Sequence, residues 1–482
     1  MPLILGTNSI KDTGYNVANS LRFNSGSSDR LTRSFSAGSS SLWTWSGWIK
    51  RSKLGSRQSI FTAYSSSSNV TRMEFTADDY LKFNDENGGN TNGRIVSSAK
   101  YRDVASWMHI VFHWDSSDST SSDRLRMYVN NVRVTDFSDT GNAPSTTSRL
   151  NTAMTHELGS ENNGTFFEGY MAEVVFINGA NLDPDQFGEY DEDSPTIWKP
   201  KDVSGLTFGT TGFHLDFEDS SALGNDVSGN NNDWTVSNLT SIDQSTDTCT
   251  NNYSTIGSLF TQVNSPTYSE GNLQSYSNAA FTSVIPSSMG FASGKWYVEL
   301  KYAATTSNDN TGIGITMDPA SANQQNTDQG GYTFGYAASS GGYFPYQSSQ
   351  SGSGSTYTVG DIMGIYMDLD NMKLYFSKNG TLNSSTGLTI NASNTGFYYF
   401  CVQDFTNTSN YWTWQWNFGA GCPFAISSGN TDDNGYGNFE YSPNITGDST
   451  AKKFYACNTK NLAEFGLWLI HQLMTQHNSS IP

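Results

Sequence analysis

The chain has 482 residues, which is too long for one hydrophobic core, so we expect two or three domains. Acidic residues outnumber basic ones by 45 to 26, and the net charge of −19 argues against nucleic acid as a partner, because a field of that sign repels a polyanion. With 45 glycines and 13% aromatic residues, the composition favours short strands and turns over long helices.

The first 14 residues, MPLILGTNSIKDTG, read as an N-terminal leader. This leader lacks the basic start and the long apolar run of a signal peptide. No stretch of the chain approaches the roughly 20 consecutive apolar residues of a transmembrane helix. We therefore expect neither a signal peptide nor insertion into a membrane.

Residues 15–182 carry a pattern of about ten short strands separated by turns, which is typical of a β-sandwich. In SWMHIVFHWD, residues 106–115, apolar or aromatic side chains occupy both faces of the predicted strand. RLRMYVNNVRV, residues 124–134, reads as a hairpin in which Asn130 and Asn131 adopt the turn.

The strand pattern stops from Leu182 to Trp198, and GFHLDFEDSSALGNDVSGNNNDWTV then reads as one strand followed by a long loop of Asp, Asn and Gly. LDPDQFGEYDEDSPTIWKP combines proline with an acidic run, and residues 236–275 are rich in serine, threonine and asparagine. We therefore expect residues 183–275 to form a linker and bridging segment between two domains.

Strands resume over residues 276–425, where GDIMGIYMDLDNMKLYFSKNGT alternates in polarity around a tight turn at Asp370 and Asn371. The sequence thus predicts an all-β protein with two β-sandwich domains of jelly-roll type, joined by a loop-rich bridge.

Residues 426–482 form a C-terminal extension with one short amphipathic helix. Its apolar side chains recur at spacings of three and four and are Leu462, Phe465, Leu469, Leu473 and Met474. Two interpretations stay open: the helix caps the second sandwich, or it forms a contact between copies of the chain.

The four cysteines are spaced too irregularly for a zinc motif, since none forms a CxxC pair; they are Cys249, Cys401, Cys422 and Cys457. We expect free buried thiols, and a disulfide between Cys401 and Cys422 is the open alternative.

Several segments of the first predicted sandwich resemble the laminin-G-like, concanavalin-A-like jelly roll. They are SLRFNSGSSDRL, WTWSGWIKR, WMHIVFHWD, RLRMYVNNVRV and FEGYMAEVVFING. Asn131 stands where that family usually has glycine. The segments GKWYVELKY, TGIGITM, GDIMGIYMDLDNMKLYFSKNGT and WQWNFG resemble a SPRY domain.

The order of these two domains, with HLDFEDSSALGNDVSGNNNDWTV between them, resembles tail-fibre or adhesin-like virion proteins of tailed bacteriophages. This resemblance implies a non-enzymatic structural protein of the virion, a tail fibre or spike that binds a host-cell receptor such as a glycan. It further implies other virion proteins as partners, a homotrimer, synthesis in the host cytoplasm and a location on an external appendage of the particle. The alternative is a polysaccharide depolymerase, a glycoside hydrolase on a jelly-roll scaffold.

In YWTWQWNFGA, residues 411–420, aromatic side chains occupy every second position: Trp412, Trp414, Trp416 and Phe418. The SPRY resemblance implies that this face points into the core of the sandwich. Trp412, at the start of the strand, is the least certain member of that core. Each buried ring removes roughly 150–250 Å² from water. In WTWSGWIKR, Trp43 and Trp45 share one face and Trp48 lies on the other, so we expect one set in the core and the other covered by a partner or a neighbouring domain.

Two sets of residues invite a chemical role, and we expect none for either. His109 and His113 are about 13 Å apart along an extended strand, too far for one metal ion to bind both. The acidic run EYDED contains Glu189, Asp191 and Asp193, but retaining glycoside hydrolysis needs two carboxyl groups about 5 Å apart on a rigid frame. This run lies in a turn-rich segment, so we expect no enzymatic activity.

A group of oxygen-bearing side chains suggests a calcium site, with no other cofactor indicated: Asp216, Asp219, Asp226, Asn230 and Asp233. The DVSGNNND string within it also resembles a segment of laminin-G-like domains, some of which bind calcium. The alternative is a loop of Asx turns that holds no ion.

The loop GYTFGYAASSGGYFPYQSSQSGSGSTY is the candidate recognition element. Tyrosine, serine and glycine dominate it, as in antibody paratopes, where rigid rings lie among adaptable polar groups. We expect Tyr343, Phe344 and Tyr346 to contact the ligand; the alternative is a hairpin without a ligand.

Overall fold

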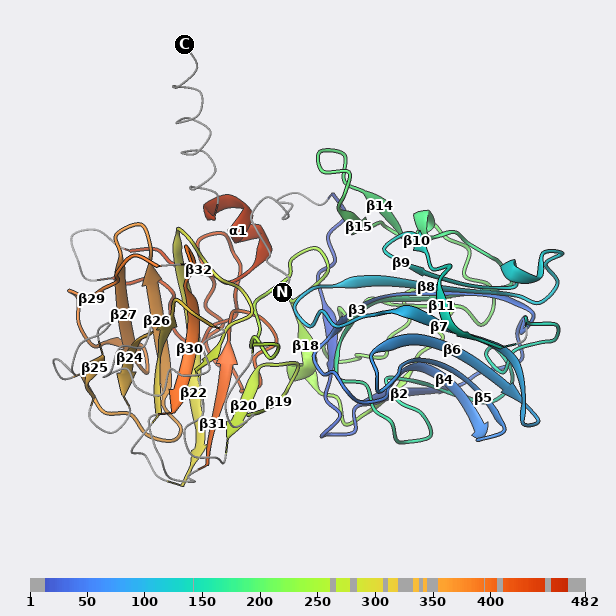
Figure 1. Ribbon diagram of the computed structural model, residues 1–482, viewed down its shortest axis with the longest axis horizontal. Helices are drawn as coiled ribbons and strands as arrows, with labels where there is room; N and C mark the ends of the chain where they lie inside the picture. The colour runs from blue at the N-terminus through green and yellow to red at the C-terminus, as the bar shows by residue number, and fades with distance from the viewer. Residues whose placement is uncertain are drawn as a thin grey trace, which may run out of the picture. The chain divides into compact units, whose positions relative to one another are not determined.

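The protein forms two compact units in a computed structural model, and the boundary between them falls between Thr250 and Asn251. Both units are built from β-sheets joined by loops (Figure 1). The structure describes residues 14–141, 143–260, 266–277, 284–306, 311–319, 333–337, 341–344, 354–393, 395–404, 411–446 and 452–466. The predicted all-β class with two β-sandwiches is confirmed.

The first unit is a sandwich of two eight-stranded sheets. One sheet runs in the order β10 (Val132–Arg133), β9 (Leu125–Val129), β8 (Met108–Asp115), β3 (Leu42–Arg51), β13 (Gly169–Asn178), β1 (Ser20–Phe23), β18 (Gln244–Ser245), with β16 (Phe213–Leu215) also on β13. The other runs β11 (Phe137–Thr140), β7 (Asn90–Lys100), β6 (Tyr80–Asn87), β5 (Asn69–Phe75), β4 (Gln58–Ser66), β12 (Thr155–Leu158), β2 (Arg30–Ser34), β17 (Thr235–Ser237).

Aromatic side chains fill the space between these two sheets. Trp43 and Trp45 on β3 are fully buried there, and the Trp43 ring stacks on that of Trp114 with centroids 6.1 Å apart. Trp48 faces the other side of the sheet, where it packs against Val17 and Ala172. Trp43 and Trp45 are therefore the core set, and segments of the unit's own chain cover Trp48.

The structure differs from the prediction that residues 183–275 form a linker and bridge. The first unit extends to Thr250, because β16, β17 and β18 each add to one of its sheets. Phe213, Leu215 and Trp234 belong to its hydrophobic core. The alternation in GFHLDF indicates a strand at β16 but not the sheet that it joins, and β17 and β18 are too short to show alternation.

The second unit is also a sandwich. Its nine-stranded sheet runs β19 (Thr267–Ser269), β20 (Gln274–Ser277), β31 (Trp412–Asn417), β22 (Lys295–Thr305), β26 (Ile362–Asp368), β27 (Lys373–Lys378), β28 (Thr381–Leu382), with β29 (Leu388–Thr389) on β27 and β32 (Tyr455–Ala456) on β22. The five-stranded sheet runs β21 (Ile285–Pro286), β30 (Tyr399–Asp404), β23 (Thr311–Thr316), β24 (Thr333–Ala337), β25 (Tyr343–Phe344). Residues 267–275, expected in the bridge, thus belong to the start of the larger sheet.

The aromatic row of β31 lies in the core of this second sandwich. Trp414, Trp416 and Phe418 are fully buried, and Trp412 is only 3% exposed. The indole N–H of Trp414 donates to Thr311 Oγ1 at 2.9 Å, so burial leaves no unpaired donor on that ring. The prediction that this face forms the core is confirmed, including for Trp412.

The C-terminal extension is built into the second unit. β32 pairs in parallel with β22, and Phe439 and Phe454 cover the outer face of the larger sheet at Tyr297 and Tyr366. The extension is thus a second layer over the sheet, which its irregular sequence did not indicate.

Helix α1 (Thr459–Phe465) begins after Asn458, whose side chain accepts the Asn461 N–H. Leu462 packs against the core, so the described part of the helix caps the second sandwich. Leu469, Leu473 and Met474 lie outside the described residues. In the part of the chain that the structure describes, no helix has the length and apolar character needed to cross a membrane.

All four cysteines are free thiols, so the alternative of a Cys401–Cys422 disulfide is wrong. Burial raises the pKa of the Cys401 thiol, which keeps it protonated and unreactive.

Candidate ligand-binding site

A pocket of about 230 Å³ opens in the second unit between strands of its two sheets. β25, the last strand of the smaller sheet, supplies one wall, and β27, β29 and the loop before β29 supply the others. The residues that line it are Tyr343, Leu374, Tyr375, Phe376, Ser384, Gly387 and Leu388.

The alternation of side chains along β27 decides which of them form the wall of the pocket. Leu374 and Phe376 on β27 point into the sandwich and belong to its core, whereas Tyr375 between them belongs to the cluster on the outer face. Tyr343 on β25 lies against Phe376, with nearly parallel rings whose centroids are 6.2 Å apart. The Tyr343 ring is half-buried, so one part of it packs on the core and the rest faces the pocket.

The loop between β28 and β29 closes the pocket. The Asn383 N–H donates to the Phe376 carbonyl at 2.9 Å, and Ser384 Oγ accepts the Thr386 N–H at 3.3 Å. Gly387 has φ +66°, and a Cβ there would lie 2.6 Å from the Tyr375 ring. Only glycine therefore lets this loop approach β27 so closely.

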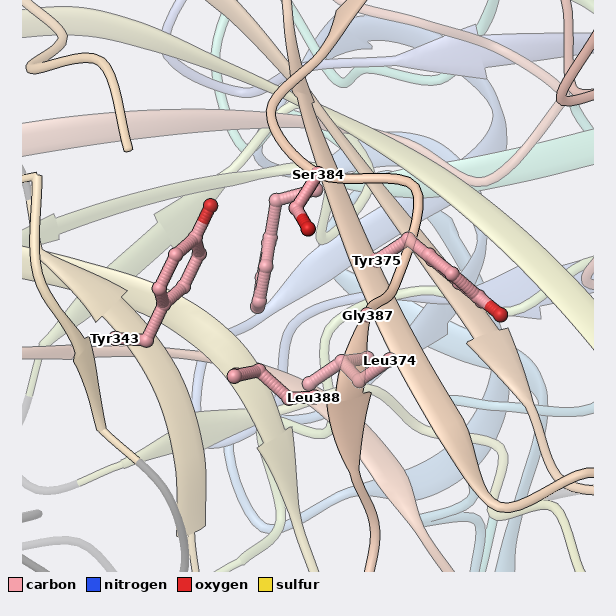
Figure 2. A pocket seen from close by; sticks show the side chains of 7 residues that line it. Tyr343, Leu374, Tyr375, Ser384, Gly387 and Leu388 are labelled. Carbon is pink, nitrogen blue, oxygen red and sulfur yellow. The ribbon is translucent and has the colours of Figure 1, made fainter. Parts of the chain in front are cut away.

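Figure 2 shows how the lining side chains are distributed. The hydroxyl groups of Tyr343 and Ser384 lie towards the upper side of the view, and Leu374 and Leu388 lie towards the lower side. Tyr375 points away from the pocket. The pocket is therefore amphipathic, with hydroxyls on one side and aliphatic carbon on the other.

The outward side of β27 is held by the C-terminal extension. The Tyr375 ring meets Phe454 edge to face with centroids 6.3 Å apart, and the Lys452 ammonium lies 5.4 Å from the Tyr375 centroid. Since β27 is packed on both faces, the pocket wall is fixed before any ligand arrives, which reduces the entropy cost of binding.

None of the lining residues carries a formal charge. Burial raises the pKa of Tyr343, so its phenol stays protonated at neutral pH. The pocket is also smaller than the roughly 300–1,000 Å³ typical of sites for drug-sized ligands. It is suited to holding one small, uncharged ring and offers no lining group for acid–base chemistry.

Of the three predicted recognition residues, Tyr343 lines this pocket and Phe344 is the second residue of β25. Tyr346 lies outside the described residues. Sequence reasoning missed Phe376, because its pattern is that of any core strand, and Ser384, because it lies in an ordinary turn. The run of small residues before Leu388, NSSTG, was the one available signal of a tight loop beside a strand.

The predicted calcium ligands do not form a shared site. Asp226 accepts the N–H groups of His214, Ser228 and Asn232, so its own loop uses its oxygens. Asp233 accepts the Asp226 N–H, and the Asn230 amide donates to two backbone carbonyls.

The two remaining candidates, Asp216 and Asp219, each accept the N–H of the residue two positions later. Within the described residues, no three His, Cys, Asp or Glu side chains are arranged to hold a metal ion. The Asx-turn alternative accounts for the observed contacts.

Both strand histidines are buried in the first unit. His109 Nδ1 accepts the Trp198 indole N–H at 3.1 Å, and its ring stacks on Trp48. Burial lowers the pKa of His109 and of His113 to about 3, so both are neutral at pH 7.

The acidic run forms part of a hairpin of β14 (Gly188–Tyr190) and β15 (Trp198–Pro200). The Lys199 ammonium lies 3.6 Å from Glu189 and 3.3 Å from Asp191. Asp191 also accepts the Asp193 N–H, which closes the turn. These contacts are those of a salt-bridged turn and not of an acid–base pair.

A different carboxylate pair, missed in the sequence, lies in the first unit. Arg57 bridges Glu74, at 2.6 Å, and Glu161. Lys82 also pairs with Glu74 and Arg72 with Glu161, at 3.0 and 2.8 Å. Each carboxylate thus meets two cations, so the cluster is an ion-pair network and not an acid–base pair.

Comparisons with known proteins agree with this architecture. Residues 24–185 match the family described as the concanavalin A-like lectin/glucanases superfamily, and residues 295–411 match the SPRY domain. No curated protein matches the chain.

Two solved structures illustrate the likeness. The SPRY domain of human HERC1 is 16% identical, covers 30% of this chain and 87% of its own, and has a TM-score of 0.25. A heptameric SAP-like pentraxin from Limulus polyphemus is 15% identical, covers 35% and 80%, and has a TM-score of 0.27. Scores this low carry no argument about function. One region of the chain thus matches a concanavalin A-like family model, and a later region matches a SPRY model.

Proposed function

We propose that this protein is a non-enzymatic attachment protein of a bacteriophage virion, a tail fibre or spike whose second unit binds a host-cell surface glycan. The observation that carries the glycan-binding part is the pocket beside Tyr343. A tyrosine that composition alone singled out for recognition forms one wall of an uncharged, preformed pocket. The virion assignment rests on the domain order.

The pocket offers the contacts that a sugar residue requires. The Tyr343 ring supplies stacking area, and the hydroxyls of Tyr343 and Ser384 supply hydrogen-bond partners. One pocket of this size gives weak binding, because association itself costs several kcal/mol. Several copies on one particle restore strength, since each later contact is intramolecular.

The same proposal assigns the chain to a homotrimer on an external part of the virion, in contact with other virion proteins. The formal charge of −19 opposes a role with nucleic acid. Light scattering of the purified full chain tests the oligomer: a mass three times that of the chain is expected, and a monomer at micromolar concentration contradicts it.

The alternative of a polysaccharide depolymerase gains no support from the two carboxylate pairs described above. Glu189 and Asp191 share Lys199, and Glu74 and Glu161 share Arg57. A carboxylic acid that must donate a proton cannot do so while held as an ion pair with cations.

The test of binding compares three full-length proteins on purified capsule and lipopolysaccharide from candidate hosts. In one variant Tyr343, Phe344 and Tyr346 are changed to serine; in the control, the exposed Tyr411 is changed to serine. We expect the triple variant to lose at least about tenfold in affinity and the control to bind and melt like wild type. The triple variant should still unfold cooperatively, at a somewhat lower temperature, because Tyr343 packs on Phe376. Equal binding by all three proteins would contradict the proposal.

The virion assignment needs its own experiment. Antibodies raised against the purified chain should label an external appendage of phage particles in electron microscopy. Labelling that is confined to the capsid interior, or absent from every particle preparation that contains the chain, would overturn this part of the proposal.

A further inference from the structure

The two sides of the pocket differ in what they can bind. Leu374 and Leu388 present only aliphatic carbon, whereas Tyr343 and Ser384 present hydroxyls (Figure 2). A plain hexose has hydroxyl groups around its whole rim, so one of them would face the leucines without a partner. Burying an unpaired hydroxyl against carbon costs free energy.

The lining residues would also disfavour an acidic sugar. None of them is basic, and the chain as a whole is strongly acidic. Two lysines lie near these strands. The Lys452 ammonium lies over Tyr375, which points away from the pocket, and the Lys373 ammonium, on the same face of β27 as Tyr375, donates to Thr389 Oγ1 at 3.0 Å. A carboxylate placed between Leu374 and Leu388 would lose its hydration without gaining an ion pair.

A methyl group avoids both the unpaired hydroxyl and the uncompensated charge. It fills the aliphatic side without an unpaired polar atom, while the remaining ring hydroxyls reach Tyr343 and Ser384. The Tyr343 and Phe376 rings, 6.2 Å apart between centroids, extend the apolar wall on which the carbon face of the sugar can stack.

We infer that the pocket selects a neutral sugar residue with a methyl-ended substituent, a 6-deoxyhexose or an N-acetylhexosamine. This inference rests on the proposed glycan binding and names the class of sugar that the same pocket takes.

The experiment titrates the full-length chain with methyl glycosides in the gluco, galacto and manno series. Each series contains the parent hexose, its 6-deoxy analogue, its N-acetyl analogue and its uronic acid. In at least one series, the 6-deoxy or N-acetyl member should bind about tenfold more tightly than the parent, the selectivity that one methyl group gives in an apolar pocket. A uronic acid that binds as tightly as the methyl-bearing sugars, or no preference in any series, overturns the inference.

Two variants test whether the aliphatic side of the pocket causes the preference for methyl-bearing sugars. Leu388→Ser should abolish the preference for the methyl-bearing sugar while leaving the parent hexose bound as before. Thr389→Ala, at the exposed neighbouring position of β29, should keep the wild-type ranking. A Leu388→Ser protein that keeps the preference contradicts the inference.

The same variants separate this inference from the proposed function. If the Tyr343, Phe344 and Tyr346 variant still binds the host polysaccharide, the proposed function fails. If that binding is lost as expected but the sugars rank in the opposite order, only the inference about the methyl group fails.

Discussion

In the first unit the buried carboxylates of Asp247 and Asp79 meet the cations Lys50 and Arg51, at 2.7 and 3.1 Å. In the second unit the buried carboxylate of Glu299 accepts hydrogen bonds from four neutral donors: the Tyr297 hydroxyl, the Asn417 amide, and the N–H groups of Glu440 and Tyr441. Burial raises the pKa of Glu299 to about 7, despite these donors.

This difference teaches how each unit responds to its surroundings. A buried ion pair holds its charge over a wide pH range but fails when one partner is removed. A buried carboxylate among neutral donors changes its protonation near neutral pH. The first unit should therefore be sensitive to mutation of a cation, and the second should be sensitive to pH.

The largest effect is expected from Lys50→Met in the first unit. It leaves the Asp247 carboxylate buried without its cation and should lower the free energy of unfolding by about 3–5 kcal/mol. Urea denaturation of the full chain measures the change. The control is Lys53→Met, since the side chain of Lys53 is 47% exposed in its pair with Glu168, and its loss should cost less than about 1 kcal/mol. If both variants lost the same free energy of unfolding, the buried Lys50–Asp247 pair would be no more important than an exposed pair.

Trp414→Ala tests whether the core of the second unit behaves independently of charge. The change empties a fully buried site beside Tyr302, whose ring stacks on Trp414 with centroids 4.6 Å apart. We expect a loss of about 3–5 kcal/mol in the free energy of unfolding, the same at pH 5 and pH 8. A variant that unfolds at wild-type urea concentrations but no longer binds glycan would place Trp414 in the binding surface instead.

A smaller effect is expected from pH on the second unit. The pKa of Glu299 is raised from 4.5 to about 7, so folding favours its protonated form. Its contribution to stability is complete below pH 4.5 and is lost as the pH rises through 7, a change of up to about 3 kcal/mol. The decline should appear between pH 5 and pH 8 in denaturation curves.

Glu299→Gln supplies the control for this pH dependence. The amide places an NH₂ group against one of the two backbone N–H donors, so the variant should be less stable at every pH. It cannot titrate, however, so the decline assigned to Glu299 should vanish. If the stability of Glu299→Gln fell with pH as steeply as that of the wild type, the pH dependence would come from other groups.

Strong alternation made parts of this fold predictable from the sequence. Trp414 and Trp416 follow a period of two in a long strand, which indicates one buried face. The role of Trp234 in the first core was not predictable, because it stands alone among polar residues. Phe213 alternates with Leu215 and Phe217, which indicates a short strand but not the sheet that it joins. Glu299 also alternates with apolar neighbours and reads as solvent-facing; its burial depends on the C-terminal extension, whose irregular sequence carries no periodicity.

The candidate site was predictable only in part, for a similar reason. Tyr343 was indicated by the unusual composition of its loop. Leu388 and Ser384 come from another part of the chain, and only the pairing of β29 with β27 brings them to the pocket. The calcium hypothesis failed to gain support because oxygen-rich composition does not distinguish a metal site from a loop that hydrogen-bonds to itself.

Hydrogen–deuterium exchange of the full chain, with and without a host polysaccharide that it binds, tests the central claim most directly. The account predicts slower exchange in peptides covering residues 341–344 and 373–389, the walls of the pocket, with no change over residues 24–185. Protection confined to residues 24–185, with residues 341–344 and 373–389 unchanged, would place the receptor site in the first unit and contradict the account.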